Sequence, residues 1–220
     1  WTDLTIFDEQ GAVVEYQAVG RDITARRQAE EAERRQRQFA EALLNSLAVL
    51  TTSLDVDQVM AQLLASAATV VPSDAGSIVL LENGYARLAY SRGFRPEVMT
   101  FFQQNRFALA SLLNMQQALA NQAPYIVLDT HLSDEWLALP LTEWIRASIG
   151  VPITRNDEMI GLLVADSATP HYFQQTDVEK LQAFARYASL ALTNAYHATV
   201  LEAQVAARTV DLQAAKEQVE

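Results

Sequence analysis

Residues 146–198 read RASIGVPITRNDEMIGLLVADSATPHYFQQTDVEKLQAFARYASLALTNAYHA, and this stretch decides the fold. It contains two apolar runs, Ala147–Ile153 and Met159–Ser167, on either side of the polar turn Arg155–Glu158. The first run alternates apolar residues with small or polar ones, which is typical of a strand that is half buried. The second run is apolar on both faces. We therefore expect an antiparallel hairpin whose second strand is covered on both sides.

A long helix is predicted to follow this hairpin. The intervening loop contains Pro170, and Thr176-Asp177-Val178-Glu179 has the pattern of a capping box, which marks the start of a helix. Apolar residues then recur at spacings of three and four, at Leu181, Phe184, Ala188, Ala191 and Ala195. Such a stripe can pack on a sheet. Because the sequence has no Gly or Pro after Thr176, we expect one helix from about Asp177 past Val210.

The order of these elements resembles the C-terminal half of a GAF domain. The resemblance is carried by Val151-Pro152-Ile153, the polar turn, Ile160–Leu163, an aromatic residue four positions before Asp177, and a helix that ends in ALTNA. A helix pair at 47–71, a hairpin around Asn83-Gly84 and a short strand at 125–128 agree with it. The resemblance implies an α/β (α+β) GAF domain over residues 47–198, with an antiparallel sheet of roughly five or six strands. Helices from both ends would pack on one face of that sheet.

The composition excludes several classes of function. The 220 residues, half of them hydrophobic, suffice for one medium domain with attachments. The net charge of -11 argues against nucleic acid or an anionic membrane surface as the partner, because phosphate groups bind clustered Lys and Arg. No apolar run is long enough to span a bilayer, and no signal peptide is evident. The start at Trp1, without Met, suggests a piece of a longer protein.

The sequence contains no Cys. This excludes thiolate zinc sites, iron–sulfur clusters and the covalently attached bilin of phytochrome-like GAF relatives. It fits a reducing compartment, so a cytoplasmic location is expected.

Residues 1–24 resemble the end of a PAS domain. Asp3–Phe7 and Ala12–Val19 are predicted strands, and Gly20-Arg21-Asp22-Ile23-Thr24 stands in the order that leads out of that family's last strand. Because two strands alone are marginal in water, we interpret this segment as a remnant without a ligand pocket. An ordinary hairpin is the alternative.

Long helices are predicted on both sides of the GAF domain. Residues 25–46 form a charged linker in which Glu30, Glu31 and Glu33 each precede an Arg by four positions. Coiled-coil seams are predicted at Ala29, Ala32, Phe39, Leu43 and Leu50, and at Leu201, Val205, Arg208, Leu212, Ala215 and Val219. These seams predict a homodimer. Residues 199–220 also resemble the helix that leads into the dimerisation region of sensor histidine kinases, and similar helices precede cyclase and phosphatase domains.

By resemblance, residues 94–144 cover the sheet and enclose any small-molecule site. The residues expected to contact a ligand are Tyr90, Arg92, Phe102, Tyr125, Asp129, His131, Trp136 and Trp144. Aromatic walls with a few polar groups are typical of ligand pockets. The alternative is that these aromatic residues only fill the core.

Cyclic nucleotides are not favoured as the ligand. GAF domains that bind them carry an Asn-Lys, Phe, Asp-Glu pattern around the last strand and helix. Here Phe173 and Asp177 match, but Asp166-Ser167 and Val178 depart from the pattern.

No catalytic residues are expected within this chain. It lacks a G-x-G phosphate loop and a recognisable Ser-His-Asp set. His131 lies near several acidic residues but has no second imidazole nearby, so a solvated loop is preferred over a metal site. The sequence thus predicts a sensory module that relays a signal to an output domain, most simply a two-component histidine kinase in a phosphorelay. The alternatives are a dimerisation spacer that senses nothing and an input domain for a cyclase or phosphatase.

Overall fold

The computed structural model describes residues 2–19, 22–52 and 55–217. The chain divides into two compact units, Trp1–Ala40 and Glu41–Glu220, which are described separately. Gly20 and Arg21 of the predicted PAS exit lie outside the described residues.

The first unit begins with an antiparallel hairpin of β1 (Thr2–Phe7) and β2 (Val13–Val19), as the sequence predicted. In its turn, Asp8 Oδ1 accepts hydrogen bonds from the backbone N–H groups of Gln10 at 2.9 Å and Ala12 at 2.8 Å. The helix α1 (Thr24–Thr52) follows, and Asp22 Oδ1 accepts the N–H of Thr24 at 2.8 Å. Hydrogen bonds from the backbone and the side chain of Thr24 lower the pKa of the Asp22 carboxyl group.

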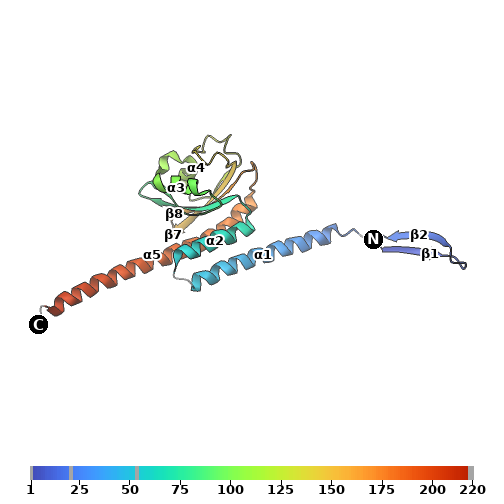
Figure 1. Ribbon diagram of the computed structural model, residues 1–220, viewed down its shortest axis with the longest axis horizontal. Helices are drawn as coiled ribbons and strands as arrows, with labels where there is room; N and C mark the ends of the chain where they lie inside the picture. The colour runs from blue at the N-terminus through green and yellow to red at the C-terminus, as the bar shows by residue number, and fades with distance from the viewer. Residues whose placement is uncertain (1, 20–21, 53–54, 218–220) are drawn as a thin grey trace. The chain divides into compact units, whose positions relative to one another are not determined.

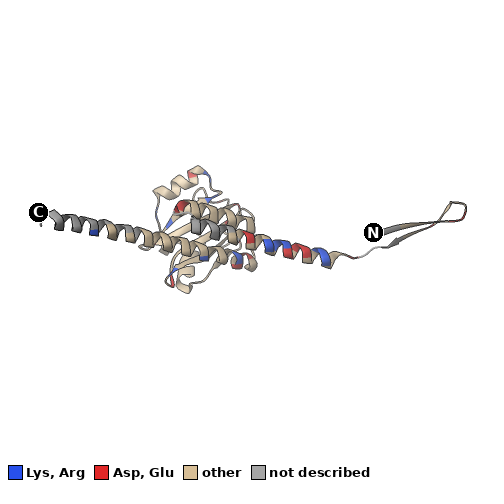
Figure 2. Ribbon diagram, turned by 90° about the horizontal axis from the view of Figure 1, so that it is seen from below, with Lys and Arg blue, Asp and Glu red and all other residues tan. Residues whose placement is uncertain are grey.

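The first half of α1 carries acidic and basic residues in alternation (Figure 2). The predicted pair of Glu33 and Arg37 is present at 3.2 Å. Glu30 pairs at 2.7 Å with Arg26, one turn before it, rather than with Arg34, one turn after it, as the sequence suggested. Both pairs are exposed, and such pairs contribute only about 0.3–0.5 kcal/mol each to helix stability.

The second unit is built on a six-stranded antiparallel sheet in the order β5-β4-β3-β8-β7-β6 (Figure 1). Its strands are β3 (Ala75–Glu82), β4 (Tyr85–Arg92), β5 (Phe107–Ala108), β6 (Tyr125–Val127), β7 (Ala147–Arg155) and β8 (Glu158–Ser167). The predicted α+β fold with an antiparallel sheet is therefore confirmed. The edge strand β5 had no signal in the sequence, because two residues are too few to show a period.

Two tight turns set the register of this sheet. Asn83 and Gly84 join β3 to β4 with φ values of 52° and 80°. Asn156 and Asp157 join β7 to β8 with φ values of 51° and 64°. Two positive φ values match the type I′ turn that suits the twist of a hairpin. The second turn is two residues shorter than the predicted polar turn because Arg155 pairs with Glu158 in the ladder.

Two helices cover one face of the sheet, α2 (Val56–Val70) and α5 (Gln175–Glu217) (Figure 1). Asp55 caps α2 by accepting hydrogen bonds from the backbone N–H groups of Asp57 and Gln58. The largest fully buried side chains include Met60, Leu63, Ile78, Ile149, Ile153, Leu163, Leu181 and Phe184. This layer forms the main core of the second unit.

The opposite face lies under α3 (Pro96–Gln104), α4 (Leu113–Asn121) and an irregular segment. We call this irregular segment, residues 128–146, the cover. β8 contributes to both layers, as expected for a strand buried on both faces. Leu162 and Val164 join the apolar cluster on the cover side, whereas Leu163 and Ala165 lie toward α2 and α5.

Helix α5 is one continuous element past Val210, as predicted, but it begins earlier than expected. The N–H of Gln174 donates to Asp177 Oδ2 at 3.0 Å, and Gln174 O accepts the N–H of Asp177. Asp177 is therefore the third residue of the helix rather than the first. The capping-box prediction was wrong by two residues, because Asp177 rather than Glu179 supplies the carboxylate that reaches back.

Candidate functional site

A cavity of about 90 Å³ lies between the sheet and its cover. Val79, Leu88 and Val164 form its floor, and Phe94 and Trp136 stand among the residues that cover it. A cavity needs roughly 10–15 Å³ to hold one water molecule, so this one can take a small organic molecule in place of several waters.

Phe94, Phe102 and Phe107 line this cavity, and Phe101 packs against two of them to complete an aromatic wall. The ring centroids of Phe102 and Phe107 are 5.5 Å apart, those of Phe101 and Phe102 are 5.6 Å apart, and those of Phe94 and Phe102 are 6.4 Å apart. The three contacts are edge-to-face, and a fourth, between Phe101 and Phe107, is tilted; offset and edge-to-face arrangements are favoured for aromatic pairs. The wall fixes the shape of the cavity without supplying a hydrogen bond.

Asp166, near the end of β8, brings a carboxyl group to the cavity. Asp166 is only 3% exposed, and this burial raises the pKa of its carboxyl group to about 7. A hydrogen bond from Ser148 acts in the opposite direction and lowers the pKa. Among the side chains that the structure describes, Asp166 Oδ1 is the one buried oxygen or nitrogen without a hydrogen-bond partner. Such an atom costs roughly 1–3 kcal/mol when it stays unpaired.

Tyr125 and Asn114 complete the polar end of the cavity. The Tyr125 hydroxyl lies 3.3 Å from Ser148 Oγ, and burial together with the charge of Asp166 raises the pKa of that hydroxyl. The Tyr125 ring lies directly over Gly150, where an added Cβ would come within 2.2 Å of Tyr125 Cε1. Gly150 is therefore required for the ring to lie in this position.

The eight residues predicted to bind a ligand separate into four groups. Phe102, Tyr125 and Trp136 do line the cavity. Trp144 lies behind its lining and packs edge-to-face on Phe94, with ring centroids 6.0 Å apart.

Tyr90 and Arg92 lie on the other face of the sheet. A β-bulge between the Ile78 and Val79 pairings adds one residue to β4, so the alternation of its side chains reverses after Leu88. Tyr90 consequently bonds to Asp57 of α2, and burial with this contact raises its pKa to about 12. Arg92 Nη2 donates to Ser73 O at 2.8 Å and to Ser73 Oγ at 3.0 Å.

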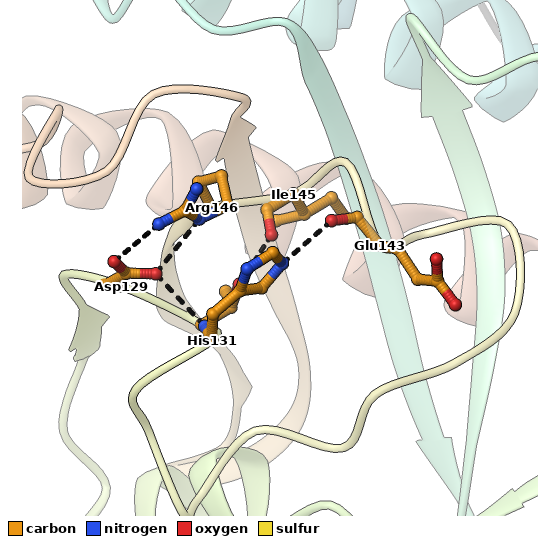
Figure 3. A network of polar contacts seen from close by, with 6 residues as sticks. Asp129, His131, Glu143, Ile145 and Arg146 are labelled. Carbon is orange, nitrogen blue, oxygen red and sulfur yellow. Dashed lines mark hydrogen bonds and ion pairs between the residues drawn. The ribbon is translucent and has the colours of Figure 1, made fainter.

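Asp129 and His131 belong to a polar network in the cover rather than to the cavity (Figure 3). Arg146 donates to Asp129 Oδ2 at 2.7 Å and to Oδ1 at 3.1 Å, and this pairing lowers the pKa of the Asp129 carboxyl group. His131 Nε2 lies 3.1 Å from Glu143 O. The network ties the start of the cover to its end.

The cover is also bonded to the loop that leads into α5. The N–H of Arg146 donates to Ser167 O at 2.7 Å, and the N–H of His171 donates to Leu128 O at 2.6 Å. Asp74 holds the same loop, because its Oδ2 accepts the N–H of Ala168 at 2.8 Å. The cover is thus joined by backbone hydrogen bonds to the end of β8 and to the loop that precedes α5.

Asp166, Ser148 and Asn114 were not predicted as site residues. Asp166 had a detectable signal, because it is a charged residue at the end of a strand that was expected to be covered on both sides. Ser148 and Asn114 had none, since a small polar residue in a strand or helix is ordinary.

The described residues include no group of three or more His, Cys, Asp or Glu that could hold a metal ion. None of the helices among them is long and apolar enough to cross a membrane.

Comparison with solved structures finds the same fold in several proteins. A free methionine-R-sulfoxide reductase from Neisseria meningitidis, solved with its substrate, is 20% identical with a TM-score of 0.62, over 73% of this chain and 91% of that one. The GAF domain of a phosphoenolpyruvate-protein phosphotransferase from Coxiella burnetii is 17% identical with a TM-score of 0.65, over 74% of this chain and 97% of that one. A bacteriophytochrome from R. palustris is 10% identical with a TM-score of 0.61, over 80% of this chain and 41% of that one.

These likenesses show the fold alone, because all three identities are low. A search among curated proteins gave no significant sequence match. The sequence model of a family described as GAF domain matches residues 53–193, which is more than half of the chain. Sequence and structure agree, and the chain belongs to the GAF domain family.

Proposed function

We propose that this GAF domain is a sensory module that binds a small molecule in the cavity and relays its presence through α5 to an output domain. The observation that carries the proposal is the cavity itself, which combines an apolar, aromatic lining with one buried carboxyl oxygen that has no partner. A core that served only for stability would gain by filling the space and by pairing that oxygen.

The relay rests on the bonds between the cover and the loop before α5. A ligand contacts cover residues such as Trp136 and Ile145, and Ile145 is adjacent to the Arg146 that bonds to Ser167. Binding would therefore change the free energy of this contact, and with it the packing of the first turns of α5. A ligand can shift an equilibrium only through such a difference between two states.

The output domain in this proposal is a cytoplasmic two-component histidine kinase within a phosphorelay, with cyclase and phosphatase domains as alternatives. Residues 47–198 would be the sensor, 25–46 the linker from a PAS remnant at 1–24, and 199–220 the helix to the output. Homodimerisation through the flanking helices is supported by Leu201 and Val205, which are 61% and 57% exposed on α5. Arg208 on the same seam is also exposed. The side chains of Leu43, Leu50, Leu212 and Ala215, and all of Val219, lie outside the described residues.

The proposal is tested by filling the cavity. Ala86 lines it, so Ala86→Leu should occupy the space, whereas Ala108→Leu on the exposed edge strand is a matched control. A small-molecule library is screened by thermal shift on the 220-residue chain. We expect at least one compound to raise the Tm of the wild type and of Ala108→Leu but not of Ala86→Leu, and to slow hydrogen exchange at residues 168–180.

Two outcomes would count against sensing in the cavity. Compounds that stabilise the wild type and Ala86→Leu equally would bind elsewhere. A library without any stabilising compound, with unchanged dimerisation of Ala86→Leu, would favour a spacer that senses nothing.

A further inference from the structure

The unpaired oxygen of Asp166 specifies more than the existence of a ligand. Its carboxyl group lines the cavity, as do the polar side chains of Ser77, Asn114 and Thr142. Asn114 and Thr142 are themselves buried, and Thr142 Oγ1 donates to Leu139 O at 3.1 Å. The buried polar side-chain atoms of these residues have hydrogen-bond partners within the protein, whereas Asp166 Oδ1 has none.

We propose that the cavity takes a compact organic cation, a small aliphatic amine whose N–H group donates to Asp166 Oδ1. This inference rests on the proposed function, because it names the class of molecule that the cavity binds.

The charge balance of the cavity favours a cation over other donors. Of the described residues that line it, only Asp166 and Tyr125 can ionise, and none is Lys, Arg or His. An ionised carboxylate in this position therefore has no counter-ion among the described residues that line the cavity. A buried charge is tolerated when it is paired and hydrogen-bonded, and a protonated amine supplies both the charge and the donor.

The aromatic wall is compatible with the same class of ligand. Phe102, Phe107 and Trp136 line the cavity, and the faces of aromatic rings attract cations. An anionic ligand, by contrast, would meet the Asp166 carboxylate without any basic residue to compensate. The cavity thus selects by charge as well as by shape.

The volume limits the size of the amine. A cavity of roughly 150 Å³ lined by apolar residues holds one benzene molecule, and the cavity here is about 90 Å³. The ligand, or the part of it that enters, should therefore have only about five non-hydrogen atoms. The pKa of about 7 for Asp166 agrees with this assignment, because a group so close to ionisation can lose its proton when a cation arrives.

Three probes with the same branched four-carbon skeleton test the inference: isobutylamine as the cation, isobutanol as the neutral donor and isobutyrate as the anion. Their binding to the 220-residue chain is followed by NMR chemical-shift changes at cavity residues. Charge-assisted hydrogen bonds are stronger than neutral ones, so we expect the amine to bind at least roughly tenfold more tightly than the alcohol and the anion not to bind.

Two variants assign this preference to one residue. Asp166→Asn keeps the size of the side chain and removes its charge, so the amine should lose at least roughly tenfold in affinity while the alcohol changes little. Asp74→Asn is the matched control, because Asp74 lies at the same end of the sheet but bonds to Ser167 and Ala168 rather than lining the cavity. It should keep the preference for the amine.

The inference is overturned if the wild type binds all three probes alike, or if Asp166→Asn keeps the preference for the amine. In both cases a bound probe at the cavity would leave the proposed sensory function standing. Absence of binding by all three probes also overturns the inference, and the library screen with Ala86→Leu then decides separately whether the cavity binds anything. The ranking of the probes on the wild type needs no variant to fold.

Discussion

The carboxyl group of Asp166 couples the stability of the domain to pH. Burial raises its pKa from the ordinary 3.8 to about 7 in the folded chain. Between these values the folded state binds more protons than the unfolded state. The free energy of unfolding should therefore be highest at acidic pH as far as this group is concerned, and should fall by at most about 1.4 kcal/mol per pH unit as the pH rises toward 7. Above that pH the contribution stays constant.

Urea denaturation at about pH 5, 6, 7 and 8 measures this dependence. Subtracting the free energy of unfolding of Asp166→Asn from that of the wild type isolates this single group. The resulting value should decrease between pH 5 and pH 7. Asp74→Asn should leave the slope as in the wild type. Parallel pH profiles for the wild type and Asp166→Asn would show that Asp166 keeps an ordinary pKa.

Gly150 is the second residue on which the cavity depends. Gly150→Ala places a Cβ within 2.2 Å of Tyr125 Cε1, so the Tyr125 ring must move away from the sheet. We expect a loss of about 1–3 kcal/mol in the free energy of unfolding, which is usual for overpacking. In the double variant with Tyr125→Ala the two losses should not add, because the clash disappears with the ring. Strict additivity in urea denaturation would contradict this account.

At the scale of elements, the pair of Arg146 and Asp129 holds the two ends of the cover together. Arg146→Gln removes both hydrogen bonds to Asp129. Hydrogen exchange should become faster throughout residues 128–146 and at the start of α5, since the cover is bonded to that loop. Arg87→Gln is the matched control, because it breaks a similar pair with Glu82 on the exposed hairpin of β3 and β4. Equal effects of both variants on the cover would mean that the network does not hold it.

The sequence was sufficient where one period governs an element. The alternation in β7, the continuous apolar run of β8 and the Asn83-Gly84 turn each predicted a strand or turn that the structure contains. The long α5 followed from the absence of Gly and Pro. These signals are local, so they can be interpreted without knowing which other segments pack against the element.

The candidate site was harder to predict because it depends on pairing across strands. A single bulge in β4 reversed the faces of Tyr90 and Arg92, and nothing in the sequence marked it. The partner of Asp129 is Arg146, which is distant in the sequence. Only the aromatic residues could be assigned in part: Phe102, Tyr125 and Trp136 reach the cavity, whereas Trp144 lies behind its lining.

At the scale of the whole molecule, the proposed dimer should respond to salt. Each chain carries a net charge of -11, so two chains repel one another, and added salt screens that repulsion. We expect sedimentation velocity to show a larger dimer fraction at high salt than at low salt. The double variant Leu201→Glu, Val205→Glu should be monomeric under both conditions, because it places charge on exposed apolar positions of α5. A dimer that persists in this variant would place the interface elsewhere.

The two-sided burial of β8 has a genetic consequence. Successive residues of this strand belong to different layers, with Val164 and Asp166 toward the cavity and Leu163 and Ala165 toward the helices. In a saturation library of β8 scored in cells, alleles should therefore alternate along the codons between two phenotypes. Cavity-side alleles should lose the response to an inducer while keeping basal signalling. Helix-side alleles should change the basal level itself.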